Sequence, residues 1–141
     1  MTAFSNYIEE KIIEASLRGA NWNANTVVYV GLCTSDPTDV TATALANEVQ
    51  PSGSVWTGYV RQSTGTSTGW AAYASGATSN LNAITFPANN GSGSITITHV
   101  ALFDASTSGN LLYRAQLVAS KTLQVNDVLS FAMGSLVITI D

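Results

Sequence analysis

The chain has 141 residues, which is the length of one domain, and its charged residues amount to only 10% against 45% hydrophobic residues, at a net charge of −4. The hydrophobic content excludes a disordered chain, and five Lys+Arg against nine Asp+Glu argue against a surface that binds nucleic acid. No run of about 20 apolar residues predicts a membrane span, and a single cysteine, Cys33, excludes a disulfide framework.

Residues 2–18 are predicted to form an amphipathic helix. Thr2 or Ser5 is placed to cap its start, and Gly19 is placed to end it. Its apolar side chains recur near the spacing of one helix face. The candidate docking or oligomerisation residues on this helix are Phe4, Tyr7, Ile8, Ile12 and Leu17. No secretory signal is recognisable in this stretch, so we expect synthesis and assembly in a cytoplasm.

Beyond residue 19 the pattern changes to short β-branched and aromatic runs separated by turn residues. Residues 26–33 predict a buried strand, and residues 42–46 predict one short helical turn. Two hairpins are predicted, one over residues 95–117 and one over 121–132 with its turn at Asn126-Asp127. Further short strands are predicted at residues 58–62, 70–73, 84–86 and 136–140.

This spacing of seven to nine strands predicts a mainly β fold, an antiparallel sandwich of the Greek-key or jelly-roll kind, with one N-terminal helix. We expect residues 1–19 to be a docking or oligomerisation element. Residues 20–141 are expected to form the β body.

Catalytic, cofactor-binding and metal-binding residues are not predicted. His99 is the only histidine, and it lies on a predicted strand with no partner motif nearby. Cys33 ends an apolar strand and is interpreted as a buried, unreactive thiol. Asp36, Asp39 and Asp104 lie among turn residues without the spacing of a calcium loop, which favours turn chemistry.

Four aromatic residues in the irregular central third form the second group of candidates. They can be read as a receptor or carbohydrate platform, or as side chains that fill the end of a sandwich or a subunit interface. We favour the second interpretation. The residues are Trp56, Tyr59, Trp70 and Tyr73.

Four stretches, in matching order, resemble a family of small virion proteins of tailed bacteriophages, described as tail-fibre-like, minor tail or head-decoration proteins. Residues 4–19 (FSNYIEEKII to LRG) are similar to the family's S-N-Y-L-E-x-K-L-L … L-R-G opening, and residues 28–37 (VYVGLCTSDP) to L-Y-V-A-L-F-T-S-D-P. Residues 47–49 and 58–62 (NEV and GYVRQ) are similar to E-V … G-Y-A-R-Q. Residues 98–105 and 109–112 (THVALFDA and GNLL) are similar to T-H-V-G-I-F-D-A … G-N-L-L.

The resemblance implies a non-enzymatic virion component with a β-sandwich-like body. We expect a capsid decoration protein or a short head- or tail-fibre subunit, and lean to the head because no repeat supplies a stalk. Its expected partners are its own copies, as a trimer, and major capsid or tail proteins, with no cofactor, nucleic acid or membrane. The alternative is a receptor-binding tail module that recognises a host surface glycan. Residues 50–57, which include Trp56, depart from the family's short link and are a candidate contact surface.

Overall fold

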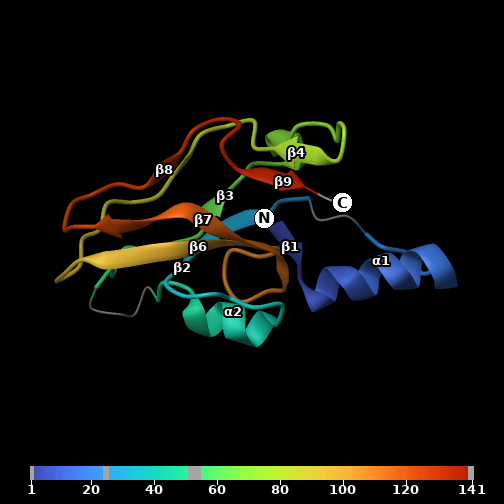
Figure 1. The fold of residues 1–141 in the computed structure, drawn as a ribbon, viewed down its shortest axis with the longest axis horizontal. Coiled ribbons are helices and arrows are strands. Elements are labelled where there is room, and N and C mark those ends of the chain that lie inside the picture. The colour runs from blue at the N-terminus through green and yellow to red at the C-terminus, as the bar shows by residue number, and fades with distance from the viewer. Residues whose placement is uncertain (1, 24–25, 51–54, 140–141) are drawn as a thin grey trace.

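The computed structural model describes residues 2–23, 26–50 and 55–139 (Figure 1). A five-stranded antiparallel sheet forms the centre of the molecule, with the strand order β1-β7-β6-β2-β3. Its strands are β1 (Thr2–Phe4), β2 (Tyr29–Cys33), β3 (Gln62–Ser63), β6 (Ile95–Phe103) and β7 (Leu111–Leu123). Two ribbons of two strands each pair β4 (Ala77–Ser79) with β9 (Val137–Thr139), and β5 (Ile84–Thr85) with β8 (Ser130–Phe131). The helices are α1 (Asn6–Arg18), α2 (Thr41–Asn47) and the 3-10 turn η1 (Ser67–Gly69). The predicted mainly β fold with an N-terminal helix is confirmed.

The five-stranded sheet is covered on both faces, as the period-2 alternation of its strands requires. Val30 and Leu32 of β2 point into the larger cluster of buried residues, which includes Ile138 of β9 and Phe86, the residue after β5. Cys33 belongs to a smaller cluster with Ala44 of α2 and with Ala101, Phe103 and Leu111. Accordingly, α2 and the β4–β9 ribbon lie on opposite sides of the sheet in Figure 1.

The N-terminal segment differs from the prediction, because residues 2–4 form a strand and the helix begins only at Asn6. Ser5 is the N-cap, one of the two caps predicted, and Gly19 ends the helix in the left-handed conformation at φ 68°. The ring of Phe4 packs 5.6 Å from that of Tyr113, and β1 pairs with β7. Tertiary pairing with an existing sheet therefore overrides the local helix pattern at these residues.

The first predicted hairpin is confirmed, and its return strand is longer than expected. β7 runs from Leu111 through Leu123 and absorbs the strand predicted at residues 121–125. The second predicted hairpin is wrong, because β8 pairs with β5 instead of with the preceding strand. A turn does lie at Asn126, where φ is 72°. The Asn126 amide donates to the Asn89 carbonyl and turns the chain towards the β5 segment.

The central third has less regular structure than predicted. The strand expected at residues 58–62 is reduced to β3, and the one expected at 70–73 is reduced to a single bridge between Trp70 and Asn80. In this region side-chain hydrogen bonds link segments that are distant in sequence. The Asn80 side chain donates to the Ala132 carbonyl and accepts from the Leu136 amide. The predicted helical turn at residues 42–46 is confirmed as α2, and β5 confirms the strand at 84–86.

Candidate functional site

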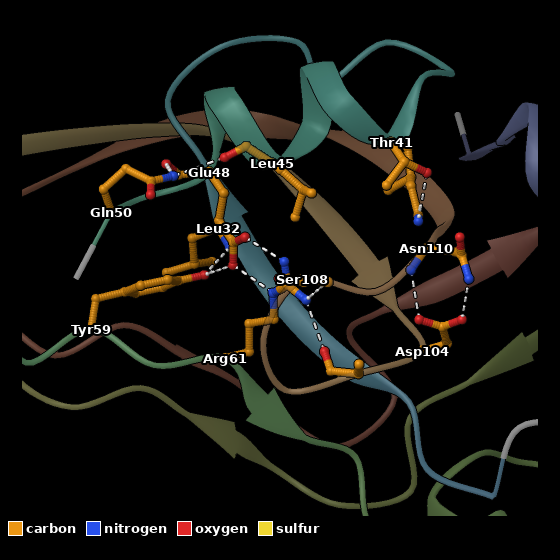
Figure 2. A network of polar contacts seen from close by, with 12 residues as sticks. Leu32, Thr41, Leu45, Glu48, Gln50, Tyr59, Arg61, Asp104, Ser108 and Asn110 are labelled. Atoms are coloured by element: carbon orange, nitrogen blue, oxygen red, sulfur yellow. Dashed lines mark hydrogen bonds and ion pairs between the residues drawn. The ribbon is translucent and has the colours of Figure 1, made fainter. Parts of the chain in front are cut away.

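A buried ion pair lies between α2 and β3, on the α2 side of the sheet (Figure 2). Glu48 directly follows α2, and Arg61 directly precedes β3. The Arg61 Nε donates to Glu48 Oε1 at 2.8 Å, and Arg61 Nη2 donates to Glu48 Oε2 at 2.6 Å. The side chains are only 4% and 6% exposed. This two-point geometry gives charge-assisted hydrogen bonds that offset the cost of burying both charges.

Tyr59 connects this ion pair to the middle of β2. Its phenol accepts from the Leu32 amide at 2.9 Å and donates to Glu48 Oε1 at 2.7 Å. Burial, followed by the adjacent Glu48 carboxylate, raises the pKa of the Tyr59 phenol well above its ordinary value. The phenol therefore stays protonated and remains a hydrogen-bond donor to Glu48.

Arg61 also holds the loop between β6 and β7. Its Nη1 donates to the carbonyl of Ala105 at 2.8 Å and to the carbonyl of Ser108 at 2.7 Å. The guanidinium carbon lies 3.4 Å from the ring centroid of Phe103, a cation–π contact. One side chain thus joins α2, β3 and the β6–β7 loop, three segments that are distant in sequence.

This network is not predicted from the sequence, although its three side chains lie in the stretches that carry the family resemblance. Glu48 lies in the stretch NEV, and Tyr59 and Arg61 lie in the stretch GYVRQ. A signal was present, because in a chain with so few charges an acid and a base inside two apolar motifs suggest a pair. Sequence alone could not show that the two motifs meet in space.

The candidate residues of the N-terminal helix divide into an anchored group and an exposed group. Ile8 is 1% exposed and packs in the core, with Phe4 and Tyr7 half-buried against it. By contrast, Ile12 is 38% exposed and Leu17 is 80% exposed. Beyond its first turn α1 extends past the sheets at one end of the molecule (Figure 1).

The four aromatic candidates are not brought together as one surface. Trp56 is 1% exposed and donates its Nε1–H to the Ala88 carbonyl, and Tyr59 belongs to the core network. Trp70 is half-buried, and Tyr73 is 69% exposed. Trp56 and Tyr59 thus fill the interior, whereas Tyr73 is exposed and Trp70 is partly exposed.

The two other side chains considered as reactive groups, Cys33 and His99, lie in surroundings that do not activate them. Cys33 is buried, and burial, followed by the nearby Glu48 carboxylate, raises the pKa of its thiol to about 12. His99 is half-buried on β6, where its Nδ1 lies 2.8 Å from the Thr98 hydroxyl. A protonated thiol at neutral pH is a poor nucleophile.

The three aspartates for which turn chemistry is predicted take part in turns and ion pairs. Asp36 accepts from the Thr38 amide at 2.9 Å, an Asx turn, and also pairs with Arg114. Asp39 pairs with the same guanidinium at 2.7 Å. Asp104 accepts from the amide of Asn110 at 2.6 Å within the β6–β7 loop. The described residues contain no group of three or more His, Cys, Asp or Glu side chains suited to a metal ion.

None of the helices formed by residues 2–23, 26–50 and 55–139 has the length and apolar character to cross a membrane. Together, the fold and the site define a small, weakly charged β protein with a buried ion pair at its centre and an extended helix at its N-terminus.

One protein family, described as Podophage GP4 fiber I protein gp80, has a model that matches residues 3–139. The chain therefore belongs to this family of phage fibre proteins, and it is a structural component of a phage virion. This confirms the resemblance to tailed-phage virion proteins. No curated protein matches the chain at significant similarity.

Proposed function

We propose that the protein is a non-enzymatic subunit on the surface of the virion and that it docks through α1. The observation that carries this proposal is the exposure of apolar side chains on the extended part of the helix. Ile12, Ile13 and Leu17 are 38%, 53% and 80% exposed, whereas Ile8 in the first turn is 1% exposed. The first turn anchors the helix to the body, and the rest presents apolar surface to another molecule.

The energetics support docking by this helix. Full burial of a side chain such as Ile or Leu contributes about 1.5–3 kcal/mol. Three such side chains supply several kcal/mol, which is modest for a single contact after the costs of association. Repeated copies on a particle convert modest contacts into stable attachment through multivalency.

Two kinds of partner fit this surface: a second copy of the chain and a major capsid or tail protein. We propose that both are used, with α1 helices joining copies into a closed trimer that is attached to the particle. Closed symmetry prevents uncontrolled growth of such an assembly. The subunit is then a short head or tail fibre, or a capsid decoration protein, assembled in the cytoplasm of the host bacterium.

Substitution of exposed apolar residues tests the proposal. Leu17→Glu and Ile13→Glu should leave the body folded, because neither side chain is buried, but should reduce both oligomer formation and incorporation into particles. Val118→Glu is the matched control, since Val118 is fully exposed on β7. Analytical ultracentrifugation and the copy number in purified particles report the two effects. If the α1 variants incorporate at full occupancy, α1 is not the docking element.

A further inference from the structure

A hollow of about 310 Å³ opens beside the buried ion pair, between the end of α2, the segment before β3 and the β6–β7 loop. Glu48, Tyr59 and Arg61 form its buried wall. Gln50 and Thr107 are exposed and contribute polar side chains at its outer edge. The residues Leu45 and Val60 add apolar surface.

The wall of this hollow retains hydrogen-bonding capacity. Arg61 uses four of its five N–H groups, on Glu48, Ala105 and Ser108. One Nη2–H remains, because within residues 2–23, 26–50 and 55–139 no further hydrogen bond from Arg61 is found. Glu48 Oε2 accepts one hydrogen bond, from Arg61, and a carboxylate oxygen can accept another.

The outer edge of the hollow adds further hydrogen-bond donors and acceptors. The Gln50 amide nitrogen donates to the carbonyls of Leu45 and Glu48, which fixes the amide group in one orientation. Its Oε1 is an acceptor with no partner among the described residues. The hydroxyl of Thr107 can both donate and accept.

The charge balance of the wall favours a neutral ligand. Glu48 and Arg61 neutralise each other, so the wall carries no net charge that would attract an anion or a cation. A ligand with several hydroxyl groups matches the mixture of donors and acceptors, and its C–H surface matches Leu45 and Val60. We propose that this hollow is a binding site for a neutral polyol, namely one monosaccharide unit of a glycan. The site goes beyond the docking function and does not depend on α1.

The test uses the full-length chain and four probes: D-glucose, D-galactose, L-rhamnose and N-acetyl-D-glucosamine. In a ¹⁵N–¹H NMR titration at millimolar concentrations, at least one sugar should shift the amide signals of Gln50, Thr107 and Ser108. Inorganic phosphate should leave these signals in place. If none of the sugars shifts them, or if phosphate does so instead, the proposal is wrong.

Variants at the outer edge sharpen the test without disturbing the ion pair. Thr107→Val removes one hydroxyl group and should weaken sugar binding about threefold to tenfold. Thr139→Val, at an exposed position on β9, is the matched control and should bind as the unchanged chain does. Equal weakening in both variants, or in neither, would overturn the assignment. Sugar binding that persists in Leu17→Glu would show that a failure of α1 docking leaves the site intact.

Discussion

Glu48 and Arg61, thirteen residues apart in sequence, pair through two hydrogen bonds of 2.8 Å and 2.6 Å in the interior of the fold. Glu48 follows α2 with a single bridge to Cys33, and Arg61 precedes a strand of only two residues, β3, so regular strand pairing is short here. The ion pair therefore does in this region what strand pairing does in the sheet, which is to fix the separation of distant segments. Its contacts with Tyr59 and with the β6–β7 loop extend the effect to β2 and β7.

Glu48→Gln should lower the free energy of unfolding by about 3–5 kcal/mol. The substitution keeps the size of the side chain but leaves the Arg61 charge buried without a counter-charge. Chemical denaturation measures the loss. Glu14→Gln is the control, because the Glu14–Arg18 pair is exposed and should contribute less than about 1 kcal/mol. Similar values for the two variants would contradict the structural role given to the buried pair.

Gly31→Ala should destabilise the fold by about 1–3 kcal/mol. A Cβ atom at Gly31 would lie 2.8 Å from Glu48 Oε1 and 2.8 Å from Phe103 Cε2. The substitution would push the carboxylate out of its position on Arg61. At Gly93, by contrast, nothing lies within 4 Å of an added Cβ, so Gly93→Ala should be close to neutral. Thermal unfolding of the two variants side by side gives the comparison.

Alkaline pH should destabilise the protein through Cys33. Burial raises the pKa of this thiol from 9.0 to about 12, so between these values the unfolded chain loses a proton that the folded chain keeps. Stability is then complete below about pH 9 and falls by up to about 1.4 kcal/mol per pH unit above it. The raised pKa of Tyr59 adds to the loss above its ordinary value of 10.0.

Comparison with Cys33→Ala isolates the thiol contribution, because the variant should show a shallower decline of stability between pH 9 and 10. Urea unfolding at a series of pH values provides the slope. A thiol reagent offers a second readout, since Cys33 should react only after unfolding. Rapid reaction of the folded protein at pH 8 would be incompatible with a buried, protonated thiol.

Ser5→Ala should lower stability by about 1–2 kcal/mol. The Ser5 hydroxyl accepts from the Ile8 amide as the helix cap and donates to the Leu111 carbonyl of β7, so it joins α1 to the sheet. Ser16→Ala removes an exposed hydroxyl that bonds within the helix to the Ile12 carbonyl. Circular dichroism during thermal unfolding should show a clear loss for the first variant and little change for the second.

Local sequence patterns predicted most of the helices and strands whose structure is determined by residues close in the sequence. The alternation of Ile and Thr before His99 predicted β6, and Gly19 predicted the end of α1, because both signals are contained in a short window. The helix predicted at residues 2–4 and the break predicted before residue 121 are wrong for the opposite reason, although residues 121–123 are in a strand as predicted. Their structure depends on pairing with segments more than a hundred residues away or, for β7, on continuation across a predicted break.

For the candidate site, too, local sequence predicts burial but not which distant residues come into contact. Burial of Cys33 could be predicted from the apolar strand that contains it, and it is confirmed. Tyr59 was singled out as an aromatic residue, but its hydrogen bonds to Leu32 and Glu48 follow from chain crossings that no local pattern encodes. The docking role of α1 stays a prediction, because a single chain shows only that Ile13 and Leu17 are exposed.

Docking through α1 is tested most sharply by a cryo-EM reconstruction of the virion at a resolution that shows side chains. We predict that Ile13 and Leu17 of α1 are buried against a neighbouring copy or a capsid or tail protein, with the β body facing outward. A reconstruction in which α1 faces solvent and the β body makes the contacts with the particle would show that α1 is not the docking element.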